Sequence, residues 1–497
     1  MFDSYISVPR RRDVLRRLVM LGMMVLLLIA AVPAAAFAQD TLVTQGAATT
    51  EDVALALDTM WVVVAAVLVL FMQAGFAMLE VGFSRMKNVG SVVAKILAMM
   101  GIGLIAFWVA GFALAFSDGG GVQSLIGTQG FFLSGDEATY AGLGWTAVPV
   151  SAKFLFQVAF ALVSLAIVWG TMLERTKFAV YCIFALVFAG VIYPVVGHWI
   201  WGGGWLSTFG MQDFAGSTVV HLSGAMAALA GTLLLGPRIG KYDDAGNPQT
   251  IPGHNMPLAV LGVIILWVGW WGFNPGSTMS AVGASFADIA LTTNLAAGAG
   301  VLGAMAMSYG YRRNLDVGMM GNGAIAALVA ITAACAFVDP WASIAIGFVA
   351  GVIMYAVLLL VDRIGVDDPL GAIAAHGMGG IWGTLSTGLF ATPALAEATA
   401  IGQPGLFYGG GFGQLGVQAL GIAACGGFVF VTSYVVFATL KATIGLRVKP
   451  EEELNGLDIS EHGVYGYSEQ LIATDYQNGS GDRIPDPAEG RTAPGTA

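Results

Sequence analysis

Long apolar stretches dominate this chain, and eleven of them are long enough to cross a lipid bilayer. The hydrocarbon core of a bilayer is about 30 Å thick, so a helix needs roughly 20 residues to span it. Only 10% of the residues are charged, against about a quarter in soluble proteins, so lipid must face most of the surface. The sequence predicts an all-α polytopic membrane protein. The predicted spans are 57–83, 90–116, 150–172, 178–200, 214–236, 256–275, 286–309, 319–337, 341–361, 371–391 and 411–440.

The basic residues of the connecting loops alternate from one side to the other. Alternate loops carry Arg85 and Lys87, Arg175 and Lys177, Arg238 and Lys241, Arg312 and Arg313, Arg363, and finally Lys441, Arg447 and Lys449. The intervening loops, 117–149, 201–213, 276–285, 338–340 and 392–410, have no Lys or Arg, and Lys153 is the one basic residue near that face. Because Lys and Arg accumulate in cytoplasmic loops, this pattern predicts an N-out, C-in topology.

The N-terminus has the layout of a secretory signal peptide. Residues 9–17 include five arginines, an apolar run follows, and Ala36-Phe37-Ala38 precedes two polar residues. A small-x-small site of this kind predicts cleavage after Ala38; the alternative is an uncleaved membrane helix. We therefore divide the chain into a signal peptide (1–38), a transmembrane domain (39–440) and a cytoplasmic tail (441–497).

One motif occurs twice, at the start of the fifth and of the tenth predicted span. Asp213 to Gly224 and Asp368 to Gly379 both follow the pattern D-x2-G-x4-H-x2-G, with His221 and His376 at equivalent positions. By the topology above, the two spans run in opposite directions. This arrangement predicts a five-plus-five inverted repeat with its functional site near the middle of the membrane.

The spacing of the motif puts both histidines close to the bilayer centre. Eight steps of about 1.5 Å carry each histidine roughly 12 Å into the membrane, and half of the hydrocarbon core is about 15 Å. The two imidazoles would meet there and share a proton between facing nitrogens. Ionisable groups at this depth normally face a cavity and serve function; the alternative is a satisfied core histidine at each position.

The two aspartates of the motif have a structural interpretation. Asp213 and Asp368 each begin a span, where a carboxylate can accept from free backbone N–H groups and face the positive end of the helix dipole. Asp213 is also a candidate to raise the affinity of the outer mouth for cations.

Aromatic residues and glycines gather at the outer ends of three spans. Phe156 and Phe160 lie on the third span, Trp201 precedes a glycine run, and Phe273 and Ser277 end the sixth span. Tryptophan belts at membrane interfaces are common, so each tryptophan alone suits an anchor. The adjacent glycines instead favour an open vestibule, in which an aromatic face attracts a small cation by about 0.5–2 kcal/mol.

Several classes of function are disfavoured. The scattered basic residues form no nucleic-acid-binding patch. Cys182, Cys335 and Cys425 all lie in apolar stretches and suit packing rather than a disulfide or zinc framework. No third ligand accompanies the two histidines with spacing suited to a metal, and no nucleophile-base set appears in the spans. We expect neither an enzyme nor a cofactor.

Several segments resemble the ammonium transporter/methylammonium permease family. DFAGSTVVHLSGAMAALAGTLLLGPR (213–238) is similar to its signature segment, and HGMGGIWGT from His376 to its second histidine segment. Further similar motifs are GFAMLEVGFSRMKN (75–88), WGGGW (201–205), GWWGFNPGS (269–277) and the tail segment GLRVKPEEELNGLDISEHGVYGY (445–467). The resemblance covers roughly residues 55–467, within which the outer loop 117–149 departs by its length and its many glycines, and residues 468–497 match nothing in the family.

The resemblance implies a homotrimer in the plasma membrane of a bacterium, with one ammonium pore per subunit. Trp201, Ser277 and Phe156 would recruit ammonium on the outside, supported by Asp213. The stacked gate would be Phe160 and Phe273, and His221 and His376 would line the pore. The tail would meet the cytoplasmic pore mouth and, in many bacteria, a trimeric PII-type nitrogen-signalling protein.

Two other functions fit the same resemblance. One is an ammonium sensor that signals through a partner, although the short tail leaves no room for an output domain. The other is a neutral-gas channel like the related Rhesus proteins, against which the Trp201 and Ser277 cation site argues.

Overall fold

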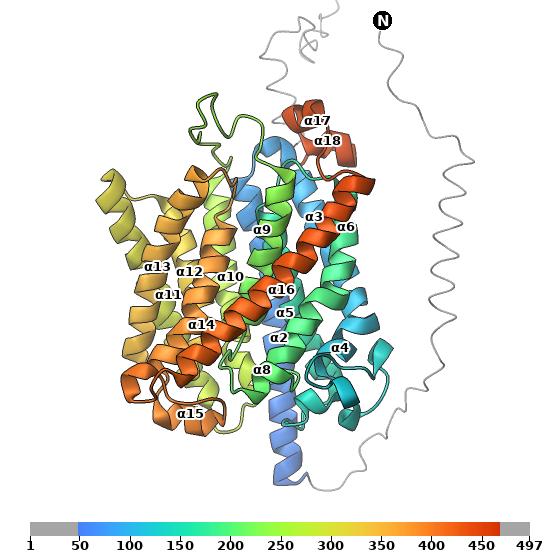
Figure 1. Ribbon diagram of the computed structural model, residues 1–497, viewed down its shortest axis with the longest axis vertical. Helices are drawn as coiled ribbons and strands as arrows, with labels where there is room; N and C mark the ends of the chain where they lie inside the picture. Colours follow the sequence, from blue (N-terminus) through green and yellow to red (C-terminus); the bar gives the residue numbers. More distant parts are fainter. Residues whose placement is uncertain (1–47, 468–497) are drawn as a thin grey trace, which may run out of the picture. The chain divides into compact units, whose positions relative to one another are not determined.

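The structure, a computed structural model, describes residues 48–467. The predicted signal peptide and residues 468–497 lie outside this range. Within it, long α-helices lie side by side in a bundle, and α16 (Gly413–Thr443) runs obliquely across its neighbours (Figure 1). The chain divides into Met1–Thr49 and Thr50–Ala497, and every helix described here belongs to the second unit.

The helices agree closely with the predicted spans. They are α2 (Thr50–Phe83), α3 (Val89–Ala106) with α4 (Phe112–Phe116), α5 (Val150–Gly170), α6 (Phe178–Val187) with α7 (Tyr193–Ile200), α9 (Ser223–Leu235), α10 (Met256–Phe273), α11 (Ser285–Arg312), α12 (Val317–Ala334), α13 (Pro340–Arg363), α14 (Gly379–Phe390) and α16. Short helices α8 (Trp205–Thr208), α15 (Pro393–Thr399), α17 (Pro450–Asn455) and α18 (Leu457–His462) lie in loops and the tail.

Ten helices of the described residues are long and apolar enough to cross a membrane. The predicted tenth segment, 371–391, is helical over Ile373–Phe390 but is not among these ten. A helix therefore occurs at all eleven predicted positions, whereas the count of eleven spans and the N-out, C-in orientation stay predictions.

Both motif histidines lie in a short π-helical turn that precedes an α-helix. The turn η7 (Ser217–Leu222) leads into α9, and the turn η9 (Ile373–Met378) leads into α14. Each turn follows a glycine with positive φ, Gly216 at 111° and Gly371 at 74°. Residues that have a Cβ atom rarely adopt this backbone conformation. Since π turns are rare and cluster at functional sites, their occurrence at equivalent positions supports the internal repeat.

Glycines bring several helices into close contact, as the sequence indicates. A Cβ at Gly262 would lie 2.3 Å from the backbone nitrogen of Leu79, and a Cβ at Gly300 would lie 2.4 Å from the carbonyl oxygen of Gly323. Such small residues let backbones approach where lipid gives no hydrophobic drive for association. Gly298 differs, because nothing lies within 4 Å of the position of its Cβ, so it takes no part in this packing.

The long outer loop, 117–149, is held by polar contacts that are partly buried. The Tyr140 hydroxyl lies 2.9 Å from the carbonyl oxygen of Gly130 and 3.0 Å from that of Ser134, and burial raises the pKa of Tyr140 to about 12. Lys153, the basic residue on this face, forms a 2.7 Å ion pair with Glu137 of the loop. The loop is thereby fixed to the outer end of α5.

Four loops on the opposite face, which the predicted topology places in the cytoplasm, meet in a group of charges that we call the cytoplasmic charge cluster: Arg85, Glu174, Arg175, Arg238 and Asp367. Glu174 pairs with Arg85 at 2.7 Å and with Arg238 at 3.3 Å. Asp367 pairs with Arg238 at 2.9 Å and with Arg175 at 3.8 Å. Both carboxylates have no exposed side-chain surface, so the cluster joins the loops that follow α2, α5, α9 and α13 at buried positions.

The described part of the tail lies against the same face. Glu453 forms a 2.8 Å ion pair with Arg447 and accepts a hydrogen bond from the backbone of Ile239 at 2.7 Å. Asp458 accepts from the backbone N–H of Ser91 at 2.9 Å, near the positive N-terminal end of α3, where a carboxylate is favoured. The tail thus contacts the loop after α9 and the start of α3.

Candidate functional site

The two motif histidines meet inside the bundle, as predicted. The Nδ1 atoms of His221 and His376 are 3.2 Å apart, and the ring centroids are 5.2 Å apart with an interplanar angle of 21°. Because one Nδ1 must donate to the other, the two rings hold opposite tautomers. The side chains are buried, and the Nε2 atom of His221 has no hydrogen-bond partner. That nitrogen is free to bind a small polar solute.

The two motif aspartates fix the backbone in front of the histidines. Asp213 accepts from the backbone N–H groups of Gly216, Thr218 and Val219 at 3.2, 3.0 and 2.9 Å. Asp368 accepts from Ala372 and Ile373 at 2.9 and 2.8 Å in the second motif. The structural interpretation of both aspartates is confirmed, since each carboxylate satisfies N–H groups at the start of its helix.

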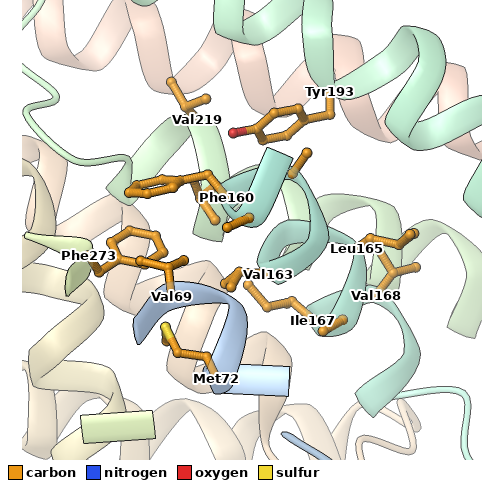
Figure 2. Close-up of a cluster of buried hydrophobic side chains, with 14 of the residues drawn as sticks. Val69, Met72, Phe160, Val163, Leu165, Ile167, Val168, Tyr193, Val219 and Phe273 are labelled. Atoms are coloured by element: carbon orange, nitrogen blue, oxygen red, sulfur yellow. The ribbon is translucent and has the colours of Figure 1, made fainter. Parts of the chain in front are cut away.

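Phe160 and Phe273 stack directly outside the histidine pair. Their ring centroids are 4.1 Å apart with an interplanar angle of 30°, and Figure 2 shows the two side chains next to each other beside Val69. Phe273 lies 5.4 Å from the ring of His221. Both phenylalanines are 1% exposed or less, so their rings close the outer approach to the histidines.

A large cavity of about 890 Å³ lies outside the stacked phenylalanines. Phe156, Phe160, Trp201, Asp213 and Ser277 all line it. The predicted recruitment residues therefore come together although they derive from four separate segments. The cavity is also walled by the outer loop, through residues 141–143 and Trp145, and by residues 398–402.

Hydrogen bonds hold the polar residues of this outer cavity in place. The indole N–H of Trp201 donates to the carbonyl oxygen of Asp213 at 2.8 Å, and the hydroxyl of Ser277 donates to that of Phe273 at 2.8 Å. The ring of Trp201 lies 6.1 Å from that of Phe160. A Cβ at Gly216 would lie only 3.0 Å from the Trp201 ring, so this position needs glycine for its packing as well as for its backbone angle.

On the inner side of the histidine pair the route narrows to a cavity of about 20 Å³. His376, Phe76, Glu80 and Asn322 are among its lining residues. The histidines thus lie between a wide outer cavity and a narrow inner one.

Sequence reasoning missed two features of this site. Trp270 stacks on His221, with ring centroids 5.4 Å apart, and donates to the Thr332 hydroxyl at 3.0 Å; a tryptophan beside an interface gave no signal for this role. Glu80 and Lys95 form an ion pair with side chains 0% and 1% exposed. Their occurrence within apolar spans was a usable signal, because charged residues there are rare and normally functional.

In the described residues, a helical bundle whose two repeated motifs bring a pair of histidines between two cavities defines a multi-pass membrane transporter. Comparison with known proteins gives the family: the model of the Ammonium Transporter Family matches residues 60–467. The chain belongs to the ammonium transporter family and is a multi-pass protein of the plasma membrane.

Curated relatives and solved structures agree with this assignment. The chain is 45% identical over 429 residues to "Ammonium transporter Amt2" of Archaeoglobus fulgidus, covering 84% of this chain and 89% of that protein. It is 36% identical to "Ammonium transporter" of Bacillus subtilis, covering 83% and 99%. A structure titled "Sensor Amt Protein" aligns with a TM-score of 0.75 at 35% identity, covering 83% and 100%, and Candida albicans Mep2 aligns with 0.74 at 30%, covering 83% and 91%.

Proposed function

We propose that this ammonium transporter recruits the ammonium ion in the outer cavity, removes its proton near the stacked phenylalanines, and passes neutral ammonia along the histidine pair. The observation that carries the proposal is the position of the His221 Nε2 atom. It is buried and lacks a partner, and the His221 ring lies between Phe273 of the stacked pair and His376, which lines the inner cavity. A solute with both donor and acceptor capacity is what such a nitrogen can bind.

The interior of the bundle favours the neutral form of the solute. A charge at the bilayer centre costs at least about 2.5–3.5 kcal/mol, and His221 is enclosed by the aromatic rings of Trp270 and Phe273. Ammonia can donate to and accept from imidazole nitrogens, whereas a potassium ion can do neither and would lose its hydration. The histidine pair therefore selects for ammonia over alkali cations.

The outer residues would act before the proton is lost. We assign recruitment of the cation to Trp201, Ser277 and Phe156, whose aromatic faces and hydroxyl attract it without a carboxylate that would hold it too firmly. Asp213 would contribute a negative field near the Trp201 indole, to which its backbone carbonyl is bonded.

Phe160 and Phe273 would serve as the gate. Their stacked rings close the direct line from the outer cavity to His221, so a solute passes only when at least one ring turns aside. This brief opening would keep a continuous file of water out of the outer half of the route.

The test is a current measurement with the purified protein in proteoliposomes on a solid-supported membrane. Ammonium and then potassium are applied as concentration jumps of equal size. A saturable current with ammonium alone supports recruitment and net charge movement. A pH change driven by ammonia without current would instead indicate a neutral-gas channel, and silence in both measurements would contradict transport.

We further propose that the chain forms a homotrimer and that its tail, with residues 237–255, offers a cytoplasmic surface to a PII-type signalling protein. The exposed apolar side chains of α2, α3 and α13 support a subunit or lipid contact. The tail contacts to Ile239 and Ser91 would transmit such binding to the bundle. Size measurement in detergent and pull-down with a PII-type protein test the two points.

A sensor role is the second candidate, because one aligned structure is titled "Sensor Amt Protein". It would use the same recruitment site while moving little ammonium. Uptake in a strain that lacks other ammonium transporters separates the two functions, since only a transporter restores growth on low ammonium.

A further inference from the structure

The inner cavity is small and mostly apolar, with a few polar residues in its lining. Its volume of about 20 Å³ exceeds the roughly 10–15 Å³ that one water molecule requires, so it holds a single molecule of the size of water or ammonia. His376 lines one part of this cavity and Glu80 another. A molecule that leaves the histidine pair therefore meets Glu80 next.

Glu80 has an unusual combination of charge and free hydrogen-bonding capacity. It lies on α2, near the cytoplasmic end of that helix, and forms an ion pair with Lys95 of α3. Its Oε2 atom contacts the Lys95 ammonium group, whereas its Oε1 atom has no hydrogen-bond partner among the described groups. An ionised carboxylate offers about four acceptor positions, and a buried one without hydrogen bonds is costly, so the remaining positions suit a polar guest in the cavity.

Lys95 lies behind Glu80 relative to the cavity. It is absent from the residues that line the cavity in the described chain, and its Nζ atom lies 5.7 Å from the centre of the Tyr181 ring. The titratable groups around Glu80 are therefore Lys95 from α3, Tyr181 from α6, and His376 across the cavity. The pair presents a carboxylate to the transported molecule and keeps its lysine away from it.

We propose that Glu80 is the inner substrate-binding and proton-donating residue of the transport route, an inference that rests on the proposed function. A hydronium ion from the cytoplasm first protonates the paired Glu80 carboxylate and leaves as water. Ammonia leaving His376 then accepts this proton: the carboxyl O–H bond breaks, a new N–H bond forms, and ammonium and a carboxylate result. Lys95 stabilises that carboxylate, and ammonium departs to the cytoplasm. A second hydronium ion from the cytoplasm then protonates the carboxylate again and leaves as water, ready for the next cycle. The product is the cation, which cannot return through the apolar stretch.

The experiment compares four forms of the full-length protein in proteoliposomes: the unaltered chain, Glu80→Gln, Glu80→Asp and the charge swap Glu80→Lys/Lys95→Glu. A matched control is Glu137→Gln. It alters the ion pair between Glu137 and Lys153, and neither of these two residues lines a cavity of the route. For each form we would measure the rate of ammonium uptake as a function of the pH on the cytoplasmic side, with the outer pH held constant.

We expect Glu80→Gln to slow uptake by at least about tenfold, since a hydrogen bond to a charged group is lost, and to flatten the dependence on cytoplasmic pH. Glu80→Asp should keep that dependence at a lower rate, and Glu137→Gln should behave as the unaltered chain. The charge swap keeps an ion pair but turns a lysine toward the cavity, so it should fold and remain slow. If the swap restores uptake, or if Glu80→Gln transports normally, the pair is structural and the proposal is overturned.

Two safeguards keep the result interpretable. If Glu80→Gln fails to fold, the comparison of Glu80→Asp with the charge swap decides, because only a cavity-facing carboxylate distinguishes them. The unaltered chain tests the proposed function separately: absence of ammonium uptake there counts against transport itself, whereas normal uptake with insensitive Glu80 variants counts only against the role of Glu80.

Discussion

The molecule contains two sets of buried charges that differ in how completely they are satisfied. In the cytoplasmic charge cluster, both oxygens of Asp367 accept hydrogen bonds from Arg238, and both oxygens of Glu174 accept from Arg85. Glu80 contacts Lys95 through Oε2, but its Oε1 atom has no hydrogen-bond partner among the described groups, and the residue lines a cavity. Because both oxygens of each cluster carboxylate already accept hydrogen bonds, the cluster serves to hold the loops together. Glu80 can still accept a hydrogen bond from a solute in the cavity.

The arginines of the cluster also keep its carboxylates ionised. Burial alone would raise the pKa of Glu174, but the guanidinium groups of Arg238 and Arg85 outweigh it and hold the pKa below its usual value. Burial likewise opposes ionisation of Asp367, and Arg175 and Arg238 lower its pKa in the same way. Burial also disfavours the charged form of Arg175, and it lowers the pKa of this arginine to about 10.

The largest effect should come from breaking the cluster. Asp367→Asn leaves Arg238 and Arg175 buried without their counter-charge, and removal of one partner of a buried pair costs about 3–5 kcal/mol. We expect a clear fall in the thermal unfolding temperature of the protein in detergent. Asp243→Asn, at an exposed position of the same face, is the control. Equal stability of the two variants would contradict the assignment of the cluster as a fastening device.

The cluster should also fail in acid. A carboxylate whose pKa is lower in the folded state contributes stability that is present above its unfolded pKa and is lost as the pH falls through the folded value. The unfolded values are 4.5 for Glu174 and 3.8 for Asp367, so the unfolding temperature should decline as the pH drops below about 4. Asp367→Asn should show a shallower decline. A parallel acid profile in both proteins would contradict this account.

The histidine pair should give the next largest effect, and on transport rather than on folding. His376→Ala removes the hydrogen-bond partner of His221, which costs about 1–3 kcal/mol for a buried polar group, and ammonium current should fall about tenfold, as about 1.4 kcal/mol corresponds to a factor of ten. Selectivity over potassium should fall as well, because the cavity beside His376 would admit more water.

The control for the pair is His254→Ala. The Nδ1–H group of His254 donates to the carbonyl oxygen of Ser84 at 2.9 Å, and His254 lines neither cavity of the route. The ammonium current of the His254→Ala protein should match that of the unaltered protein. A His376→Ala protein with unchanged current and unchanged selectivity over potassium would count strongly against ammonia passing along the histidines.

Local patterns predicted the helical fold and the meeting of the two histidines, whereas the roles of the aromatic residues followed only from the family resemblance. Apolar length predicted the helices, because a span must satisfy its own backbone in lipid. The spacing from Asp213 to His221, repeated from Asp368 to His376, predicted that the imidazoles meet. Both predictions depend on distance along one helix, which the chain sets directly.

Contacts between distant segments were beyond such reasoning. Neither the pairing of Glu80 with Lys95 nor the stacking of Trp270 on His221 follows from spacing, because each depends on how two helices rotate against each other. The cytoplasmic charge cluster was missed for the same reason: Arg175 and Arg238 were interpreted only as marks of orientation. The π turns that aim both histidines also left no mark in the apolar pattern.

The smallest effect should come from the outer cavity, where the proposed contacts between ammonium and the aromatic faces are weak. Trp201→Ala removes an aromatic face worth about 0.5–2 kcal/mol to a cation, so the ammonium concentration for half-maximal current should rise about two- to thirtyfold, while the maximal current changes little. Trp271→Ala, whose side chain is 48% exposed on the surface of the bundle, removes a tryptophan from outside the cavity and should leave both values unchanged. If Trp201→Ala lowered only the maximal current, the tryptophan would control passage rather than recruitment. The outer half of the route would then control the rate of passage, as we propose for the inner half, and would not set the affinity for ammonium.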